Sequence, residues 1–263
     1  MNRGVFVMEG TVVIRLLTRN GFPMEINGEL LNRVRVIGHR GWPILYPDNV
    51  LAGIMAAAEV ADMVEVDIRA TSDGTLILSH DPYLGGKSIA ETPWSELADL
   101  DLGDGYRPLD LTGLMAALPT FPIDLEIKNF PSEPGFDPEH GMALRTAEAA
   151  RQGDLLSCFY WPTMDAVREE RPAVATGLLV DQGWSLADAV DHAIARGHVA
   201  VIPQFELALS SEAAVRTASE AGLVVAVWTL NDPSLARQLA LMGVTAIITD
   251  DPGYMKRELK EHL

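Results

Sequence analysis

Two histidines that each follow an apolar run are the side chains in this sequence best suited to proton transfer. His39 follows the run 34–38, and His80 follows the run 75–79. An imidazole gains and loses a proton near neutral pH, so such a pair can act as a base and an acid. Asp81, directly after His80, could orient its ring. Together with carboxylates that hold a divalent cation, this pair is what cleavage of a phosphate ester requires.

Three carboxylates could supply the site for that cation. Glu65 and Asp67 lie two positions apart on an apolar run, so as strand residues they point to the same side, and Glu126 lies on another such run. Burying paired carboxylates is costly unless a cation offsets them. The simpler alternative is salt bridges to Arg69 or Arg40. Three carboxylates favour Mg²⁺ or Ca²⁺ over zinc.

Two cationic side chains and one aromatic side chain complete the candidate set. Lys128 shares a face with Glu126, where it could neutralise the acids or contact a phosphoryl oxygen. Arg40 offers a bidentate fork for phosphate, and Gly41 permits a sharp turn after it. Trp228 ends an apolar run, where it is either core or an aromatic wall for an alcohol group.

The remaining histidines and the single cysteine are assigned no role. Cys158 lies in an apolar run, which indicates a buried structural thiol. The other four histidines fall in helical or loop patterns and are expected to be solvated: His140, His192, His198 and His262.

The composition narrows the classes of partner and compartment. The chain has 263 residues, of which 48% are hydrophobic, and a formal net charge of −17. Such a surface repels nucleic acid and anionic lipid, so a broad interaction with either is not expected. One cysteine allows no intrachain disulfide, and no run approaches the ~18 apolar residues of a membrane span. Residues 1–17 form a poor secretory signal, so the cytoplasm is the default location.

Strand-like and helical patterns alternate from residue 34 onward. The eight expected strands are 34–38, 63–69, 123–128, 155–160, 176–180, 199–203, 223–229 and 245–249. The expected helices are 49–61, 93–100, 111–118, 139–152, 163–170, 185–196, 211–221, 233–242 and 256–261. Near-continuous apolar strands indicate a parallel sheet covered on both faces. Eight β–α units predict a single (β/α)₈ TIM barrel. A doubly wound sheet is the competitor, but no glycine-rich fingerprint follows the first strand.

The chain divides into two parts on this interpretation. Residues 1–33 are an N-terminal arm or extra strands, and residues 34–263 form one barrel domain. No linker, repeat or low-complexity tract indicates a further domain, and nothing fixes the oligomeric state.

Taken in order, these motifs resemble the glycerophosphodiester phosphodiesterase family. The motifs are H-R-G, E-x-D, D-G-x₅-H-D, E-I-K, W-T-x-N and a final T-D-x-P, and they cover residues 35–253. The resemblance implies a (β/α)₈ barrel that hydrolyses glycerophosphodiesters to an alcohol and glycerol 3-phosphate with a divalent metal. It implies acid–base roles for His39 and His80, metal binding by Glu65, Asp67 and Glu126, phosphate contacts from Arg40 and Lys128, and a pocket wall at Trp228.

One motif departs from the family, and two other activities stay open. Where the family has P-E-N-T, this chain has Pro47, Asp48, Asn49 and Val50. Asp48 should still cap the following helix, but contacts of the longer acid or the hydroxyl are lost. The first alternative is a phospholipase D-like or lysophospholipid-cleaving barrel that acts on lipids at a surface. The second is a barrel that binds a phosphodiester without cleaving it.

Overall fold

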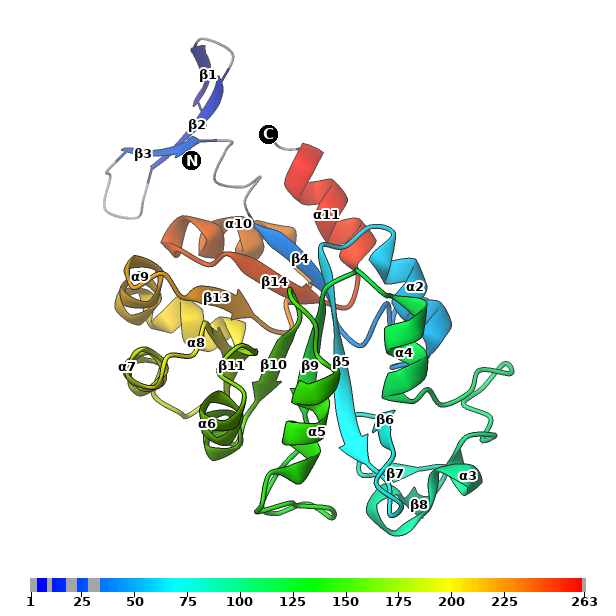
Figure 1. The fold of residues 1–263 in the computed structure, drawn as a ribbon. Helices are drawn as coiled ribbons and strands as arrows, with labels where there is room; N and C mark the ends of the chain where they lie inside the picture. The colour runs from blue at the N-terminus through cyan, green and yellow to red at the C-terminus, as the bar shows by residue number, and fades with distance from the viewer. Residues whose placement is uncertain (1–3, 9–10, 18–22, 28–33, 262–263) are drawn as a thin grey trace.

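Eight parallel strands close into a barrel in the computed structural model of the chain (Figure 1). The structure describes residues 4–8, 11–17, 23–27 and 34–261. The barrel strands are β4 (Arg35–Gly38), β5 (Met63–Ala70), β9 (Ile123–Ile127), β10 (Leu155–Cys158), β11 (Ala175–Val180), β12 (Ala200–Pro203), β13 (Val224–Val227) and β14 (Ala246–Thr249). β4 pairs with both β14 and β5, which closes the ring. The expected (β/α)₈ barrel is therefore confirmed.

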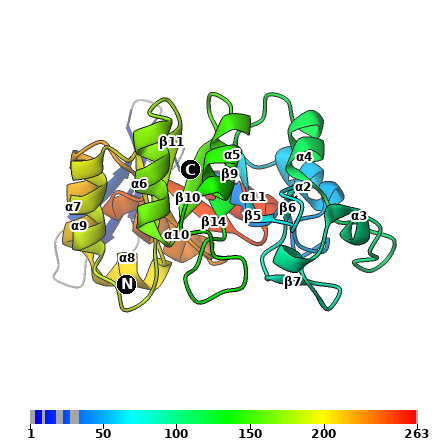
Figure 2. The ribbon, with the colours of Figure 1, turned by 60° about the horizontal axis from the view of Figure 1, so that its bottom comes forward.

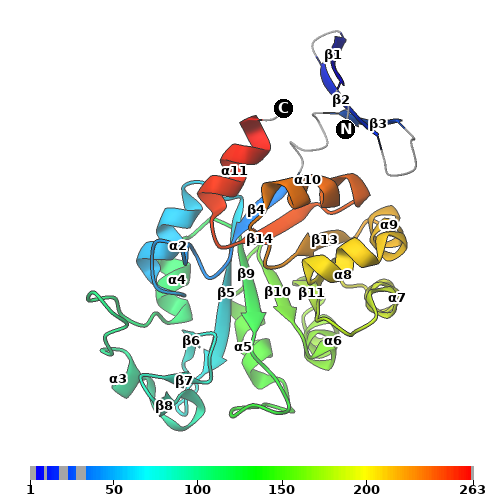
Figure 3. The same ribbon diagram turned by 180° about the vertical axis from the view of Figure 1, so that it is seen from behind.

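Helices surround the barrel between successive strands (Figures 1 and 3). They are α2 (Leu51–Ala58), α4 (Leu111–Ala117), α5 (Gly141–Ala149), α6 (Trp161–Glu170), α7 (Leu186–Arg196), α9 (Glu212–Glu220), α10 (Pro233–Met242) and α11 (Pro252–Glu261). Their ends follow local chemistry. Ser185 caps α7 by accepting from the Asp188 N–H at 3.1 Å, and Gly243 ends α10 with a φ of 114°.

Several short elements lie between β5 and α4 and after β12, and one of them is the helix expected over residues 93–100. After β5 the chain turns back into β6 (Leu76–Leu78), which pairs antiparallel with β5. The segment that follows holds β7 (Tyr83–Leu84), β8 (Lys87–Ser88), the 3₁₀ turn η1 (Ile89–Glu91) and α3 (Trp94–Leu97), and Figure 2 shows it projecting to one side. The short helix α8 (Phe205–Ser210) follows β12.

The core has two layers because each strand is covered on both faces. Val64, Val66 and Ile68 of β5 belong to the large cluster between barrel and helices. Met63 instead belongs to the cluster of Ile37, Leu179, Ala200, Ile202, Ala226, Ala246 and Ile248. Side chains alternate along a strand, so Glu65 and Asp67 share the face of Met63 and point into the barrel. The inner face of β5 thus carries Met63 in apolar packing and, further along the strand, the two acids.

The N-terminal region contains three strands that pair antiparallel with one another: β1 (Gly4–Met8), β2 (Thr11–Leu17) and β3 (Pro23–Asn27). The boundary at residue 33 stays a prediction, and His262 lies outside the described residues. In the part of the chain that the structure describes, every helix is too short or too polar to cross a bilayer.

Candidate active site

A cavity of about 270 Å³ opens at the carboxyl ends of the barrel strands, a size near the lower limit of small-molecule sites. Its walls include His39, Arg40, Glu65, Arg69, His80, Asp124, Glu126, Lys128, Phe130, Glu133, Ser157, Phe159, Leu179, Asp181, Trp184, Trp228, Thr229 and Ile248. Both candidate histidines, two of the three candidate carboxylates and both candidate cations therefore meet at one mouth of the barrel. Asp67, the third carboxylate, is fully buried behind this wall.

The three candidate carboxylates form one buried cluster. Asp67 and Glu126 are directly paired across β5 and β9, and Glu65 is paired with Asp124 one step below. One oxygen from each of Glu65, Asp67 and Glu126 lies within 4.8 Å of the others. Burial and repulsion from the neighbouring acids raise the pKa of Glu65 well above its usual range. The carboxylates are thus crowded together in a place where their charges repel.

This cluster fits a divalent cation. Glu65 Oε2 accepts the Arg40 backbone N–H at 2.9 Å, but Oε1 is buried without a hydrogen-bond partner among the described residues. Burial raises the pKa of Asp124, the fourth acid, to about 7. Four carboxyl groups face two cationic side chains, which leaves two negative charges in excess when all are ionised. Oxygen donors with that excess suit Mg²⁺ or Ca²⁺.

Lys128 and Arg40 are both engaged with the acids. Lys128 Nζ lies 2.5 Å from Glu126 Oε1 and 2.9 Å from Asp67 Oδ1. Burial opposes its charge, but Glu126 and Asp67 raise the pKa of Lys128. Burial also opposes ionisation of Asp67, yet Lys128 and Arg40 lower the pKa of Asp67 to about 2. The neutralising interpretation of Lys128 is therefore seen directly, and the ammonium also lines the cavity.

The turn after β4 is held by contacts that the sequence did not specify. Gly41 has a φ of +91°, and a Cβ there would lie 2.8 Å from the backbone N of Ile54, so the sharp turn requires glycine. Asn49 Nδ2 donates to Asp67 Oδ2 at 2.8 Å. The expectation that Asp48 caps α2 is wrong. Its carboxylate pairs with Arg40 at 2.7 Å, and α2 begins after Val50 without a side-chain cap.

The ring of His39, which follows the first barrel strand, is held by a residue that follows the last one. Its Nδ1–H donates to Asp250 Oδ1 at 2.7 Å, and Asn231 Nδ2 donates to Asp250 Oδ2 at 2.8 Å. These bonds, with that from His39 the larger effect, lower the pKa of Asp250 despite its burial. Thr249 is paired with Gly38 across β14 and β4, which places Asp250 beside His39. The free Nε2 of His39 can therefore exchange a proton in the cavity.

His80 is held more loosely, and largely by its own neighbours. Its Nδ1 lies 2.8 Å from Asp81 Oδ1, as the sequence suggested. The return strand β6 brings it back beside β5, where the Ser79 N–H donates to the Asp67 carbonyl at 3.0 Å. Arg69 donates from Nε (2.9 Å) and Nη2 (2.6 Å) to the His80 carbonyl. The backbone is therefore well placed, while the ring faces solvent.

Aromatic rings form the opposite wall of the cavity. Trp228 lies edge-to-face with Phe159 at 5.3 Å between centroids, and Phe159 contacts Phe130 and Trp184 at 5.6 and 6.4 Å. The Trp228 Nε1–H donates to the Ile202 carbonyl at 2.9 Å, which fixes the ring. Trp228 is thus part of a pocket wall rather than only of the core.

This geometry agrees with the comparison to known protein families. The model of the glycerophosphoryl diester phosphodiesterase family matches residues 39–254. The chain belongs to this family. Glycerophosphodiester phosphodiesterases are phosphoric diester hydrolases, so the protein is an enzyme.

Relatives and solved structures of the family span most of the chain. The chain is 25% identical to the glycerophosphodiester phosphodiesterase of Caldanaerobacter subterraneus over 238 residues, 82% of this chain and 94% of the relative. The crystal structure of the Thermotoga maritima glycerophosphodiester phosphodiesterase is 27% identical with a TM-score of 0.71, covering 85% of this chain and 97% of that one. A phosphodiesterase of Oleispira antarctica, solved with the product sn-glycerol-3-phosphate, shares the fold at 23% identity and a TM-score of 0.74, covering 86% and 96%.

The predictions for residues outside the candidate site had mixed outcomes. Cys158 is buried as expected, and burial raises its pKa to about 12. The expectation that His198 is solvated is wrong, because only 3% of it is exposed. The sequence analysis gave no role to Asp250 or Asn231, although both lie in the motifs that carried the family resemblance. The signal that could have found them is barrel closure, which makes the last strand a neighbour of the first.

Proposed function

We propose that the protein hydrolyses glycerophosphodiesters to an alcohol and glycerol 3-phosphate with His39 and His80 as the acid–base pair. The observation that carries this proposal is that both imidazoles border one cavity with the acidic cluster of Glu65, Asp67 and Glu126. These three carboxylates would hold Mg²⁺ or Ca²⁺, which when bound supplies a Lewis acid that offsets charge on the phosphoryl oxygens.

The side chains of this chain supply the proton transfers. One histidine takes the proton of the nucleophile, which is water or the free glycerol hydroxyl of the substrate, as its oxygen bonds to phosphorus. The P–O bond to the alcohol then breaks, and the other histidine protonates the departing oxygen. With the hydroxyl as nucleophile the first product is a cyclic glycerol phosphate, and a water molecule then breaks one of its ring P–O bonds to give glycerol 3-phosphate. Each ring has its Nδ1 directed at an aspartate, so Nε2 is the exchanging atom in both.

Arg40, Lys128 and Trp228 would bind the substrate. An ammonium group has three N–H donors, and Lys128 donates one to Glu126 and forms an ion pair with Asp67, so a donor is left for a phosphoryl oxygen. Arg40 lines the same wall and adds positive charge. Trp228 closes the pocket on the side of the alcohol group.

Product assays test this proposal. Release of glycerol 3-phosphate from glycerophosphocholine, glycerophosphoethanolamine and glycerophosphoglycerol is measured with and without EDTA, then after Mg²⁺ or Ca²⁺ is restored. We expect activity to vanish with EDTA and to return with metal. The variants H39A and H80A should each lose about 10²–10⁴-fold in turnover. R216Q, which removes an exposed arginine paired with Glu212 on α9, is the matched control. If H39A or H80A lost less than tenfold in turnover, the histidine replaced in that variant would have no role in proton transfer.

A lysophospholipid is the second candidate substrate, because apolar side chains are exposed at the same end of the barrel. Trp184 lines the cavity with 43% of its surface exposed, and Ile44 and Leu45 in the loop after β4 are 62% and 60% exposed. Turnover of lysophosphatidylcholine compared with that of glycerophosphocholine distinguishes the two. A preference for the lipid would establish the second candidate.

A further inference from the structure

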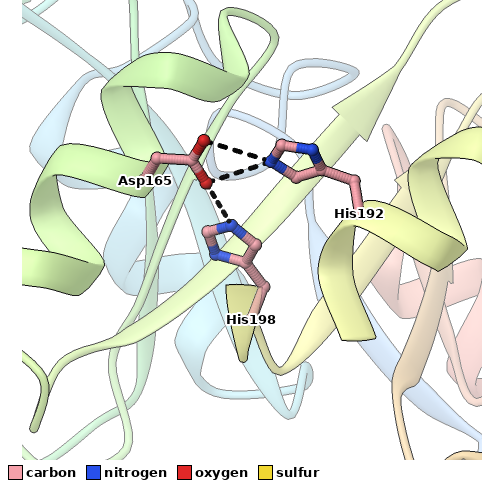
Figure 4. A group of neighbouring side chains, drawn as sticks. All are labelled: Asp165, His192 and His198. Carbon is pink, nitrogen blue, oxygen red and sulfur yellow. Dashed lines mark hydrogen bonds and ion pairs between the residues drawn. The ribbon is translucent and has the colours of Figure 1, made fainter. Parts of the chain in front are cut away.

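A second cluster of titratable side chains lies between two outer helices. Asp165 projects from α6, His192 projects from α7, and His198 lies in the turn between α7 and β12 (Figure 4). None of the three is among the residues that line the catalytic cavity. The three side chains come together from elements that are separate in sequence, so the tertiary fold is needed to assemble them.

Each of the two imidazole rings directs its Nε2 atom at the same carboxylate oxygen of Asp165. His192 Nε2 and His198 Nε2 each lie 3.0 Å from Asp165 Oδ1, and the two rings stack with an interplanar angle of 10°. Arg196 Nε approaches the same oxygen at 3.3 Å. Three nitrogens therefore converge on a single oxygen, which is more than its two lone pairs can accept well.

The buried ring is held from behind in the manner of a metal ligand. His198 Nδ1 lies 2.8 Å from Thr176 Oγ1, and both side chains are fully buried. With Nε2 on a metal, Nδ1–H would donate to this hydroxyl, and such an outer contact fixes ring orientation and tautomer.

We propose that Asp165, His192 and His198 form a second metal site, which takes an ion of the Zn²⁺ class. Two imidazole nitrogens and one carboxylate oxygen suit Zn²⁺ or Co²⁺, whereas the oxygen-only cluster in the cavity suits Mg²⁺ or Ca²⁺. Metal–ligand bonds of about 2.0–2.1 Å at tetrahedral angles place ligand atoms about 3.3 Å apart. The two nitrogen–oxygen separations are 3.0 Å, and all three ligand atoms lie within 4.8 Å of one another, so small side-chain rotations would reach this geometry.

The site is reachable, and it has a competitor. The His192 side chain is 32% exposed and that of Asp165 is 18% exposed, so an ion and a water can enter from solvent. The Arg196 guanidinium is the cation beside Asp165 in this structure. It also pairs with Glu169 at 2.5 Å, so it can leave Asp165 and stay paired on the surface. A bound ion would join α6, α7 and the start of β12. Its effect should therefore be on stability rather than on turnover.

Cobalt spectroscopy with E65Q protein tests the site, because that substitution disables the oxygen cluster. Co²⁺ in a tetrahedral N,N,O site should give intense visible bands and bind with one-to-one stoichiometry, with Zn²⁺ displacing it. Adding H192Q should abolish these bands and weaken Zn²⁺ binding by 100-fold or more. T176V should weaken binding by about 10–100-fold. R196Q should tighten binding, because it removes the competing cation.

Thermal unfolding and activity give independent readouts. Zn²⁺ at about 100 times its dissociation constant should raise the Tm of E65Q by about 5 °C and leave that of E65Q/H192Q unchanged. H192Q alone should hydrolyse its substrate at the wild-type rate, so failure of the metal site and failure of the proposed catalytic function are distinguishable. Absence of tetrahedral bands in folded E65Q, or bands that persist in folded E65Q/H192Q, would overturn the proposal and leave a hydrogen-bonded clamp between the helices.

Discussion

The two sides of the candidate active-site cavity are lined by side chains of different chemistry. The side formed by β4, β5 and β9 carries ionisable groups joined by short contacts, such as Lys128 between Glu126 and Asp67. The side formed by β10, β11 and β13 carries rings packed edge-to-face, such as Phe159 against Trp228. We expect the charged contacts to strengthen as charge develops in the transition state, and the aromatic contacts to bind a substrate group equally in the ground state and the transition state. Substitutions on the two sides should therefore separate kcat from KM.

The largest loss is expected on the charged side, at Glu65. The variant E65Q keeps the shape of the side chain and the bond from the Arg40 N–H, but removes the charge beside the unpartnered oxygen. We expect kcat for glycerophosphocholine at saturating Mg²⁺ to fall by about 10³-fold or more, because several kcal/mol of charge stabilisation depend on the held cation. Turnover within tenfold of the wild type would show that the charged side does not act through a cation at Glu65.

Asp250 should give the next largest effect, because it fixes His39. The variant D250N can leave His39 in the wrong tautomer, and we expect kcat to fall by about 10²-fold with little change in KM. An unchanged kcat, or an equal effect on KM, would mean that Asp250 does not position the ring. Asn231→Asp is the companion variant, because it replaces the donor to Asp250 with a like charge.

For the variant D250N we also predict how its effect on stability depends on pH. The bond from His39 holds the pKa of Asp250 below its usual range, so its stabilising effect is present above the unfolded value near 4. That effect is lost as pH falls through the lower folded value. The difference in unfolding free energy between wild type and D250N should therefore be largest near neutral pH and should shrink below about pH 4. Urea unfolding at both pH values measures it.

The barrel was predictable because its signals are local. Apolar runs gave the eight strands, and cues such as Ser185 and Gly243 marked helix ends where the structure has them. The side-chain alternation of β5 then placed Glu65 and Asp67 inside the barrel. Short α8 was missed, because six residues between two stronger patterns carry little periodicity.

The two sequence predictions that were wrong depend on side-chain contacts that a local pattern does not show. His198 reads as a polar turn residue, but Thr176 and Asp165 surround it. Asp48 reads as a helix cap, but Arg40 binds its carboxylate. The local sequence pattern identified the candidate side chains. Which of them are in contact depends on how the barrel closes.

The aromatic side should give a smaller effect, mostly on binding. We expect W228A to raise KM for glycerophosphocholine by about fivefold, since a cation over an aromatic face contributes about 1 kcal/mol. The effect should be less for glycerophosphoglycerol, which has no cation. W228F keeps a ring but removes the donor to Ile202, so it is the matched control. An equal effect on both substrates would assign the wall to shape alone.

The smallest effect is expected at Asp81, and it sharpens the contrast between the two histidines. Asp81 contacts His80 as Asp250 contacts His39, at 2.8 and 2.7 Å. However, the side chains of His80 and Asp81 are 42% and 76% exposed, against 18% and 27% for His39 and Asp250. Water screens an exposed pair and can replace the lost partner. We therefore expect D81N to lower kcat by no more than about threefold, measured beside D250N on the same substrate. Equal losses in the two variants would mean that substrate binding buries the His80 pair, and that exposure in the free enzyme does not rank the two aspartates.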